Sequence, residues 1–246
     1  MEFIVNYDLK IFQTLNELSI QFAEILKNEV SLAKNNFNLV LSGGSTPKYI
    51  FNYLSANHKT TIEWNKINFF WGDERCVPPD NEESNYKMAY ETLLSKVPVS
   101  KENIFRIKGE YKPDDEAKRY SDLITSKVNL KNGLPQFDLI ILGLGEDGHT
   151  ASIFPDQIQL INDEKICSIA VHPETKQKRI TLTGSVINNA RNVVFIVTGK
   201  NKSKVVDDIL NHKQDSKKYP ASFIKPLNGK LFWLLDKEAA SLLKGN

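Results

Sequence analysis

Five short runs of apolar residues, separated by helical segments and by loops rich in glycine and charge, constrain the fold of this chain most. The runs lie at 37–41, 67–71, 138–142, 193–197 and 231–235. Each is apolar along almost its whole length, which is typical of strands that are buried on both faces. Such strands, when they alternate with helices, form a mostly parallel sheet that is covered on both sides.

The segments between these runs predict the covering helices. Apolar residues recur at helical spacing along 11–32, so they share one helical face. Pro47 is expected to open a helix with Thr46 as its cap, and Ser84 to cap another. The other helices are expected at 84–94, 112–128, 200–210 and, near the end of the chain, from Lys237. No linker interrupts the pattern, so residues 1–246 are expected to form a single domain.

The composition excludes several classes of protein. The chain has 32 Lys and Arg against 30 Asp and Glu, a net charge of +2 that argues against a dedicated nucleic-acid binder. No apolar run approaches the ~20 residues that a bilayer requires, and residues 1–10 do not resemble a secretory signal. Cys76 and Cys167 have no paired spacing, which fits a reducing, cytoplasmic compartment. Four histidines lie too far apart in sequence for a local metal site, so no metal is expected: His58, His149, His172 and His212.

Ligands bind parallel sheets at the carboxyl ends of the strands, so the loops that follow the strands are the candidate site. The first loop has two glycines and three hydroxyl side chains ahead of a helix, a good cradle for a phosphate. A tight turn with a threonine cap explains the same residues equally well, and no Walker A lysine follows. The candidate phosphate-binding residues here are Ser42, Gly43, Gly44, Ser45 and Thr46.

The second loop carries Asp73, Glu74 and Arg75 directly after a strand. A solvated cluster of charges is one interpretation. The other is that Arg75, with its rigid fork of donors, binds an oxyanion or a phosphate and is held in place by Asp73.

The third loop, 143–152, fits both G-x-G-x-x-G and, in part, a P-loop. Both interpretations are disfavoured, because Glu146 and Asp147 would repel a pyrophosphate and a neutral His149 cannot replace the P-loop lysine. What remains is a carboxylate two residues from an imidazole on a glycine-rich turn. Histidine titrates near neutrality, so His149 is a candidate general acid or base.

The fourth loop places Lys202 in the first turn of a helix, where a bound anion would offset the unfavourable dipole. A surface lysine is an equally good explanation. Arg179 is a possible second cation, although the sequence does not place it. Taken together, the four loops indicate an enzyme that acts on a small phosphorylated metabolite by acid–base chemistry, without a covalent serine.

These loops also carry a family resemblance. The segments 42–47, 71–78, 84–89 and 143–155, together with 179–183 and 233–236, occur in an order that resembles the 6-phosphogluconolactonases. The resemblance implies an open three-layer α/β/α sandwich with a Rossmann-like central sheet and no cofactor. It also implies hydrolysis of 6-phospho-D-glucono-1,5-lactone to 6-phosphogluconate in the oxidative pentose phosphate pathway. The expected partner is this phosphorylated sugar lactone, and the expected state is a monomer or a weak homodimer.

Glucosamine-6-phosphate deaminase/isomerase is the alternative enzyme, since it shares the cradle and the Asp-Gly-His turn. Phe154 stands where the deaminase pattern has a carboxylate, and Arg75 where it tends to have tyrosine, so both departures favour the lactonase. A sugar-phosphate-binding protein without catalysis is the third possibility. The intact pair of Asp147 and His149 argues against it.

The lactonase resemblance predicts a role for each candidate residue. His149 would take a proton from water and return it to the ring oxygen. The first loop and Lys202 would hold the phosphate, and Arg75 would stabilise either the phosphate or the oxyanion. Asp147 would orient His149 or stabilise its charged form, and Asp73 would orient Arg75. The sequence does not show which of the two aspartates contacts the histidine.

Overall fold

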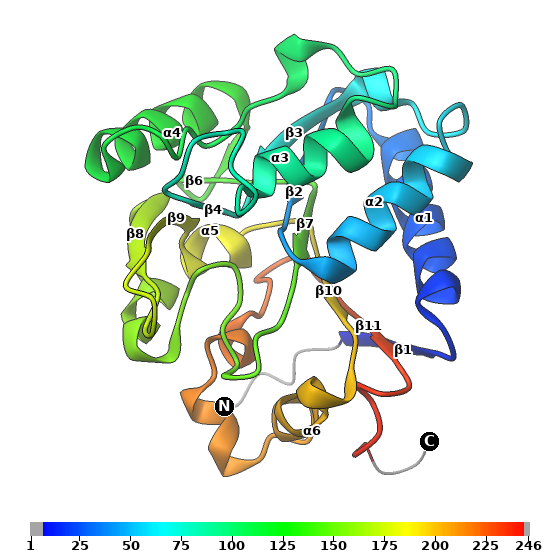
Figure 1. Cartoon of the computed structure of the whole chain (residues 1–246), viewed down its shortest axis with the longest axis vertical. Coiled ribbons are helices and arrows are strands. Elements are labelled where there is room, and N and C mark those ends of the chain that lie inside the picture. The colour runs from blue at the N-terminus through cyan, green and yellow to red at the C-terminus, as the bar shows by residue number, and fades with distance from the viewer. Residues whose placement is uncertain (1–6, 244–246) are drawn as a thin grey trace.

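The computed structural model describes residues 7–243, and its central element is a six-stranded sheet in which all neighbouring strands are parallel. The strands lie in the order β1-β11-β10-β7-β2-β3 (Figure 1). Their bounds are Tyr7–Phe12 (β1), Phe37–Leu41 (β2), Ile67–Trp71 (β3), Leu139–Leu142 (β7), Asn192–Val197 (β10) and Lys230–Asp236 (β11). All five predicted strands are confirmed, and β1 is an addition.

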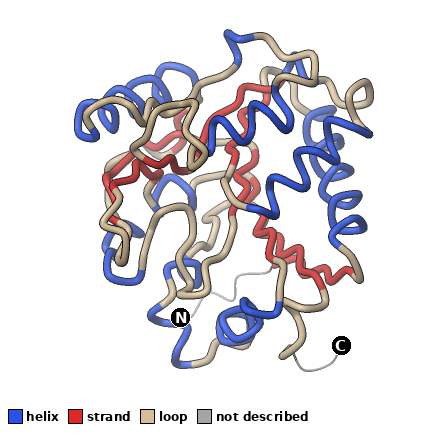
Figure 2. The backbone as a smooth tube through the Cα atoms, in the orientation of Figure 1, coloured by secondary structure: helices blue, strands red, loops and turns tan. Residues whose placement is uncertain are grey.

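Helices cover both faces of this sheet, which confirms the three-layer α/β/α arrangement (Figures 1 and 2). α1, α2 and α3 lie on the right-hand side in Figure 1, and α4 and α5 on the left. α6 lies below, near β10, β11 and β1. The helix bounds are Leu15–Leu32 (α1), Ser45–Asn57 (α2), Asn85–Ala89 (α3), Pro113–Lys127 (α4), Gly184–Asn188 (α5) and Ser203–Leu210 (α6). No helix within residues 7–243 is long and apolar enough to cross a membrane.

Short strands outside the central sheet were not predicted. β4 (Asp73–Arg75), β9 (Lys178–Leu182) and β8 (Cys167–Val171) form an antiparallel three-stranded sheet, and Leu130–Lys131 (β5) pairs with Leu134–Pro135 (β6). β4 lacks a strand signal because it is three residues long and fully charged. The pairing of β4 with β9 places Arg75 opposite Arg179, and this gives the position of Arg179 that the sequence left open.

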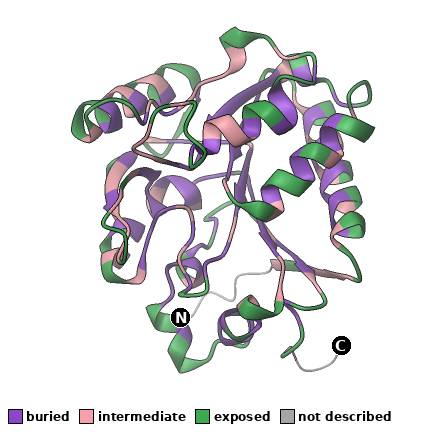
Figure 3. Cartoon of the chain, viewed as in Figure 1, coloured by how far each residue is buried: buried purple, intermediate pink, exposed green. Residues whose placement is uncertain are grey.

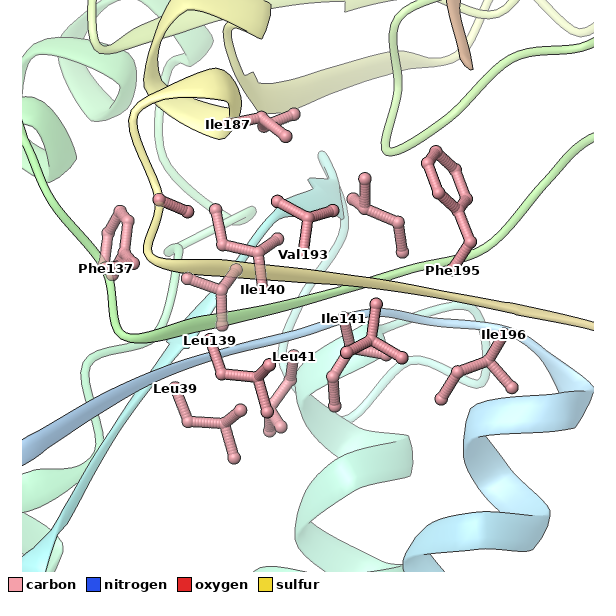
Figure 4. Close-up of a cluster of buried hydrophobic side chains, with 14 of the residues drawn as sticks. Leu39, Leu41, Phe137, Leu139, Ile140, Ile141, Ile187, Val193, Phe195 and Ile196 are labelled. Atoms are coloured by element: carbon pink, nitrogen blue, oxygen red, sulfur yellow. The ribbon is translucent and has the colours of Figure 1, made fainter. Parts of the chain in front are cut away.

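The core explains why the strands are apolar without alternation. Side chains from one face of the strands, such as Leu41 and Ile196, point toward the helices below them in Figure 4, and Val193 and Phe195 point the other way, toward Ile187 of α5. All are buried, and burial extends through β2, β3, β7 and β10, whereas the edge strand β1 is only partly buried (Figure 3). Burial of both faces requires apolar residues at successive positions.

Three details of the predicted helices are wrong. Residues 11 and 12 belong to β1, because Thr14 caps α1 by accepting from the N–H of Glu17 while Glu17 accepts from the N–H of Gln13. Thr46 is not a cap: α2 begins at residue 45 after Gly44, whose φ of 111° requires glycine. The chain after residue 236 forms turns as far as residue 243 rather than a helix.

The other predicted helices are confirmed with changes at their ends. Ser84 caps α3, accepting from the N–H of Lys87 at 3.1 Å. The predicted helix at 84–94 changes to a π turn at Tyr90–Leu94, and α6 is preceded by a 3-10 turn at Lys200–Lys202. Further 3-10 turns lie at Trp64–Lys66, Lys101–Asn103, Pro155–Ile161, Gln214–Lys218 and Pro220–Phe223.

The strand order reverses direction in the middle of the sheet. From β2 the chain moves outward to β3, whereas from β7 it moves through β10 to β11 on the other side. β2 and β7 are paired through Leu39 and Leu139. The connections that leave their carboxyl ends diverge, and a crevice opens between them at this switch point.

We expect Tyr120 to fasten α4 to the sheet edge. Its fully buried hydroxyl accepts from the N–H of Trp71 at 2.8 Å and donates to the carbonyl of Trp71 at 3.2 Å. Tyr120→Phe leaves both groups unpaired and should lower the free energy of unfolding by ~1–3 kcal/mol. Urea denaturation measures this, with the exposed Tyr90 changed to Phe as the control, for which we expect a change within ~0.5 kcal/mol. Equal midpoints for the two variants would contradict the assignment.

Candidate active site

A cavity of about 370 Å³ lies at the switch point and brings the four predicted loops together. Its wall is built from the loops that follow β2, β7 and β10, with further residues from β4, α3, β9 and the end of β10. All but one of the predicted site residues line it: Ser42, Gly43, Gly44, Ser45, Thr46, Asp73, Arg75, His149, Arg179 and Lys202. The remaining one, Asp147, contacts the imidazole of His149.

Two glycines of the third loop shape the turn that carries His149, and one of them makes room for its ring. The N–H of Gly145 donates to the carbonyl of His149 at 2.9 Å, and the N–H of Gly148 donates to that of Gly145 at 3.1 Å. Gly148 has a φ of 82°, which favours glycine. A Cβ on Gly145 would lie 2.1 Å from Nδ1 of the imidazole. The glycine spacing of this loop therefore serves the imidazole.

Asp147 is the carboxylate that orients this histidine. Its Oδ1 lies 2.6 Å from Nδ1 of His149 and 3.1 Å from the backbone nitrogen of the same residue. Burial works to raise the pKa of Asp147, but the hydrogen bonds and the interaction with His149 outweigh it and hold this pKa below its usual value. An ionised Asp147 accepts a hydrogen bond from Nδ1–H, so Nε2 is left as the basic nitrogen.

Phe154 forms an apolar wall behind the imidazole. Its ring is fully buried, with its centroid 4.9 Å from that of His149. The guanidinium carbon of Arg179 lies 5.6 Å from the same centroid, within the range of a cation–π contact. The position that the sequence comparison contrasted with a carboxylate thus holds an aromatic ring in contact with the proposed base.

Three cations face the cavity. Burial lowers the pKa of Lys202, against the opposing influence of Glu146 and Asp147. Burial also lowers the pKa of Arg179, with Asp73 opposing the shift and Arg75 adding to it. The Nε atoms of both arginines are buried without a hydrogen-bond partner in the described chain. Buried donors and positive charge in one cavity favour an anionic ligand.

The first loop presents the start of α2 to the cavity. Ser45 and Gly44 are exposed there, and the first N–H groups of a helix have no partner within it. The Oγ1 atom of Thr46 lies 2.7 Å from that of Thr198, so this side chain joins the loops after β2 and β10. The geometry is that of an anion cradle, as predicted, although the threonine bridges two loops and does not cap the helix.

The charges of the second loop are not a solvated cluster. Glu74 is 2% exposed and accepts hydrogen bonds from the N–H groups of Arg75, Asn85 and Tyr86 and from the hydroxyl of Ser84. Burial raises its pKa, against the effect of these four bonds. Glu74 thereby anchors the start of α3 beside the cavity.

Asp73 forms no ion pair with the guanidinium of Arg75, the partner that the sequence predicted. Its Oδ2 accepts from the hydroxyl of Ser152 at 2.6 Å, whereas Nη1 of Arg75 donates to the carbonyl of Glu83. Within residues 7–243, no ion pair joins Asp73 to the guanidinium of Arg75. Asp73 therefore braces the loop that carries His149, and a backbone carbonyl positions Arg75.

Sequence reasoning missed several residues of the cavity. Asn85 follows a recognisable helix cap, but nothing in the sequence aims its amide at the cavity. Thr198 and Asn201 lie in the fourth loop, where the sequence indicated only Lys202 as a candidate. Ala151 has a φ of 49°, unusual for a residue with a side chain. No group of three or more His, Cys, Asp or Glu residues within 7–243 is placed to hold a metal ion.

A family model described as "Glucosamine-6-phosphate isomerases/6-phosphogluconolactonase" matches residues 13–233. The chain belongs to this family. It is 42% identical to the 6-phosphogluconolactonase of Haemophilus influenzae over 207 residues, which cover 84% of this chain and 87% of that protein. It is 35% identical to a probable 6-phosphogluconolactonase 2 of Oryza sativa over 253 residues, covering 97% and 90%. The 6-phosphogluconolactonase structure from Trypanosoma brucei superposes with a TM-score of 0.88 at 33% identity, covering 97% of this chain and 99% of that one. Within the family, the chain therefore groups with the lactonases.

Neither thiol of this protein is expected to be reactive. Burial, reinforced by Glu74, raises the pKa of Cys76 to about 11, and burial raises that of Cys167 to about 12. A raised pKa means less thiolate, so at pH 8 roughly one Cys76 thiol in a thousand is ionised. Alkylation of the native protein by iodoacetamide, followed by mass spectrometry, should therefore be far slower than that of free cysteine. Rapid labelling that is lost in Cys76→Ser would contradict this.

Proposed function

We propose that this protein hydrolyses 6-phospho-D-glucono-1,5-lactone to 6-phospho-D-gluconate, with His149 as general base and then general acid. The observation that carries the proposal is the pair of Asp147 and His149 on the wall of a cationic cavity. The relatives that share the fold and a third or more of the sequence are named 6-phosphogluconolactonases, which supports the same reaction.

The phosphate of the substrate would bind between the first loop and Lys202. The exposed start of α2 supplies free N–H groups, and the hydroxyls of Ser42 and Ser45 add donors. Nζ of Lys202 lies 3.8 Å from Glu146 Oε1, a loose ion pair. A phosphate dianion is a stronger partner for this ammonium group than an exposed carboxylate at that distance.

His149 would activate the attacking water. Because Asp147 holds Nδ1, Nε2 is the atom that accepts a proton as water attacks C1 of the lactone. The C1–O bond of the ring then breaks, and the imidazolium returns the proton to the departing ring oxygen. The ionised Asp147 stabilises the imidazolium between these steps, as it would in any acid–base pair of this kind.

Negative charge develops on the carbonyl oxygen during the attack. Arg75 and Arg179 supply buried positive charge to the cavity, either to this oxyanion or to the phosphate. A lactone is an activated ester, so hydrolysis needs no covalent intermediate. The ring of Phe154 against the imidazole, in place of the carboxylate expected of a deaminase, favours lactone hydrolysis over deamination.

The decisive test is acid release from freshly generated 6-phosphogluconolactone near neutral pH, with the spontaneous rate subtracted. We expect the wild-type protein to accelerate hydrolysis and His149→Ala to lose ~10²–10⁴-fold in kcat, since general acid–base catalysis contributes about that much. His58→Ala, at the end of α2, is the matched control and should keep full activity.

Ammonia release from glucosamine 6-phosphate is measured alongside. Deamination without lactone hydrolysis would reverse the assignment, and activity on neither substrate would favour a binding protein. Full lactonase activity of His149→Ala would remove the histidine from the mechanism and leave the reaction intact.

Lys202→Ala should raise KM for the phosphorylated lactone by ~10-fold or more, because a charged hydrogen bond to the phosphate is lost. Its kcat should change less. The control is Lys200→Ala, an exposed lysine in the same turn, for which we expect an unchanged KM. A KM that is equal in the two variants would mean that the phosphate binds elsewhere in the cavity.

A further inference from the structure

Asn85 is a buried amide in the cavity wall with no role in the chemistry described so far. The residue is 3% exposed and lines the cavity. It is the first residue of α3, and its N–H donates to Oε1 of Glu74 at 2.7 Å. Its backbone is therefore fixed by a buried contact, independently of any ligand.

The orientation of the Asn85 amide follows from its neighbours. Nδ2 donates to the backbone carbonyl of Asp73 at 2.9 Å, and a second contact at 3.4 Å reaches Oδ1 of the same residue. Two acceptors on this side require the nitrogen of the amide, because an amide oxygen there would face two oxygens. Oδ1 of Asn85 must therefore point away from Asp73.

Oδ1 occupies space that only a glycine leaves open. A Cβ on Gly43 would lie 1.9 Å from Oδ1 of Asn85. Gly43 does not have a positive φ, so glycine is needed here for space rather than for conformation. Within residues 7–243, no group donates a hydrogen bond to this oxygen. The first loop and α3 thus place an acceptor without a partner beside the phosphate cradle.

The chemistry of this oxygen limits what it can bind. A carbonyl oxygen only accepts hydrogen bonds, so it repels a phosphate, a carboxylate or an oxyanion. The cations of the cavity serve those anionic groups. Among the groups of a phosphorylated sugar lactone, the hydroxyls are the donors.

We infer that Oδ1 of Asn85 accepts a hydrogen bond from a secondary hydroxyl of the sugar ring, and that this contact makes the site select hydroxylated lactones over deoxy lactones. The inference rests on the proposed function. Gly43 acts as the positioning residue, since it leaves the space that Oδ1 occupies in the cavity wall.

The test is a double-mutant cycle in which one change is made in the protein and the other in the substrate. kcat/KM is measured for 6-phosphogluconolactone and for its 2-deoxy, 3-deoxy and 4-deoxy analogues, with wild-type protein and with Asn85→Ala. We expect the wild type to disfavour at least one analogue by ~10-fold, the value of one hydrogen bond in a buried site. Asn85→Ala should treat that analogue and the parent lactone within about twofold of each other.

The ratio of kcat/KM for the parent lactone to that for a deoxy analogue distinguishes recognition of the hydroxyl from a purely structural role of Asn85. Loss of the bonds to Asp73 would slow all substrates by the same factor and leave the ratio unchanged, and an unchanged ratio overturns the inference. A wild type that accepts all three deoxy analogues as well as the parent overturns it too. Asn68→Ala is the matched control: this buried amide binds Oδ1 of Asn38 at the opposite end of the strands, so the wild-type ratio should persist.

Gly43→Ala is the second variant, and it decides the matter if Asn85→Ala does not fold. Its Cβ would displace Oδ1 of Asn85, so the ratio should again fall toward one. Failure of the wild type to hydrolyse the parent lactone would overturn the proposed function itself. Normal lactone hydrolysis with an unchanged ratio would overturn only the role of Asn85.

Discussion

The parallel pairing of β2 with β7 is the constraint on which the site depends. Leu39 pairs with Leu139 at the point where the strand order reverses, so the loops that leave these two strands diverge. One loop carries the start of α2 and the other carries His149, and neither contains the whole site. Cavity residues separated by about a hundred positions in the sequence meet because parallel strands end at the same edge. The antiparallel strand β9 completes the wall by setting Arg179 in register with Arg75.

The cavity contains positive charges that the stability of the fold alone would not favour. Two arginines in register repel each other, and each has a buried Nε without a partner. Burying unpaired donors and like charges costs stability, and natural proteins retain such costs mainly where function requires them. Within residues 7–243, no carboxylate forms an ion pair with either arginine: Glu74 anchors α3, Asp73 binds Ser152, and Asp147 binds His149. The buried guanidinium donors are therefore left for a ligand.

The sequence predicted the central sheet well because burial on both faces leaves an unambiguous apolar signal in each strand. It missed β4, β8 and β9 because β4 is three charged residues and the other two strands are only partly buried, so none of them has a continuous apolar run. In the site, the contact of Asp147 with His149 could be predicted from the sequence, since two residues on one glycine-rich turn lie close together in any fold. The partner of Asp73 could not be predicted from the sequence, because Ser152 is 79 residues away and the contact exists only through tertiary structure.

The glycines show that the spacing of a motif can locate a site without identifying its ligand. The pattern in 143–148 fits a dinucleotide fingerprint, yet Gly145 is required because His149 packs where its Cβ would be. Gly43, in the loop read as a phosphate cradle, leaves space for the amide oxygen of Asn85. In both places the missing side chain admits a polar group of the protein to the cavity. The chemistry of the site therefore follows from what occupies the space beside each glycine, which the spacing of glycines does not reveal.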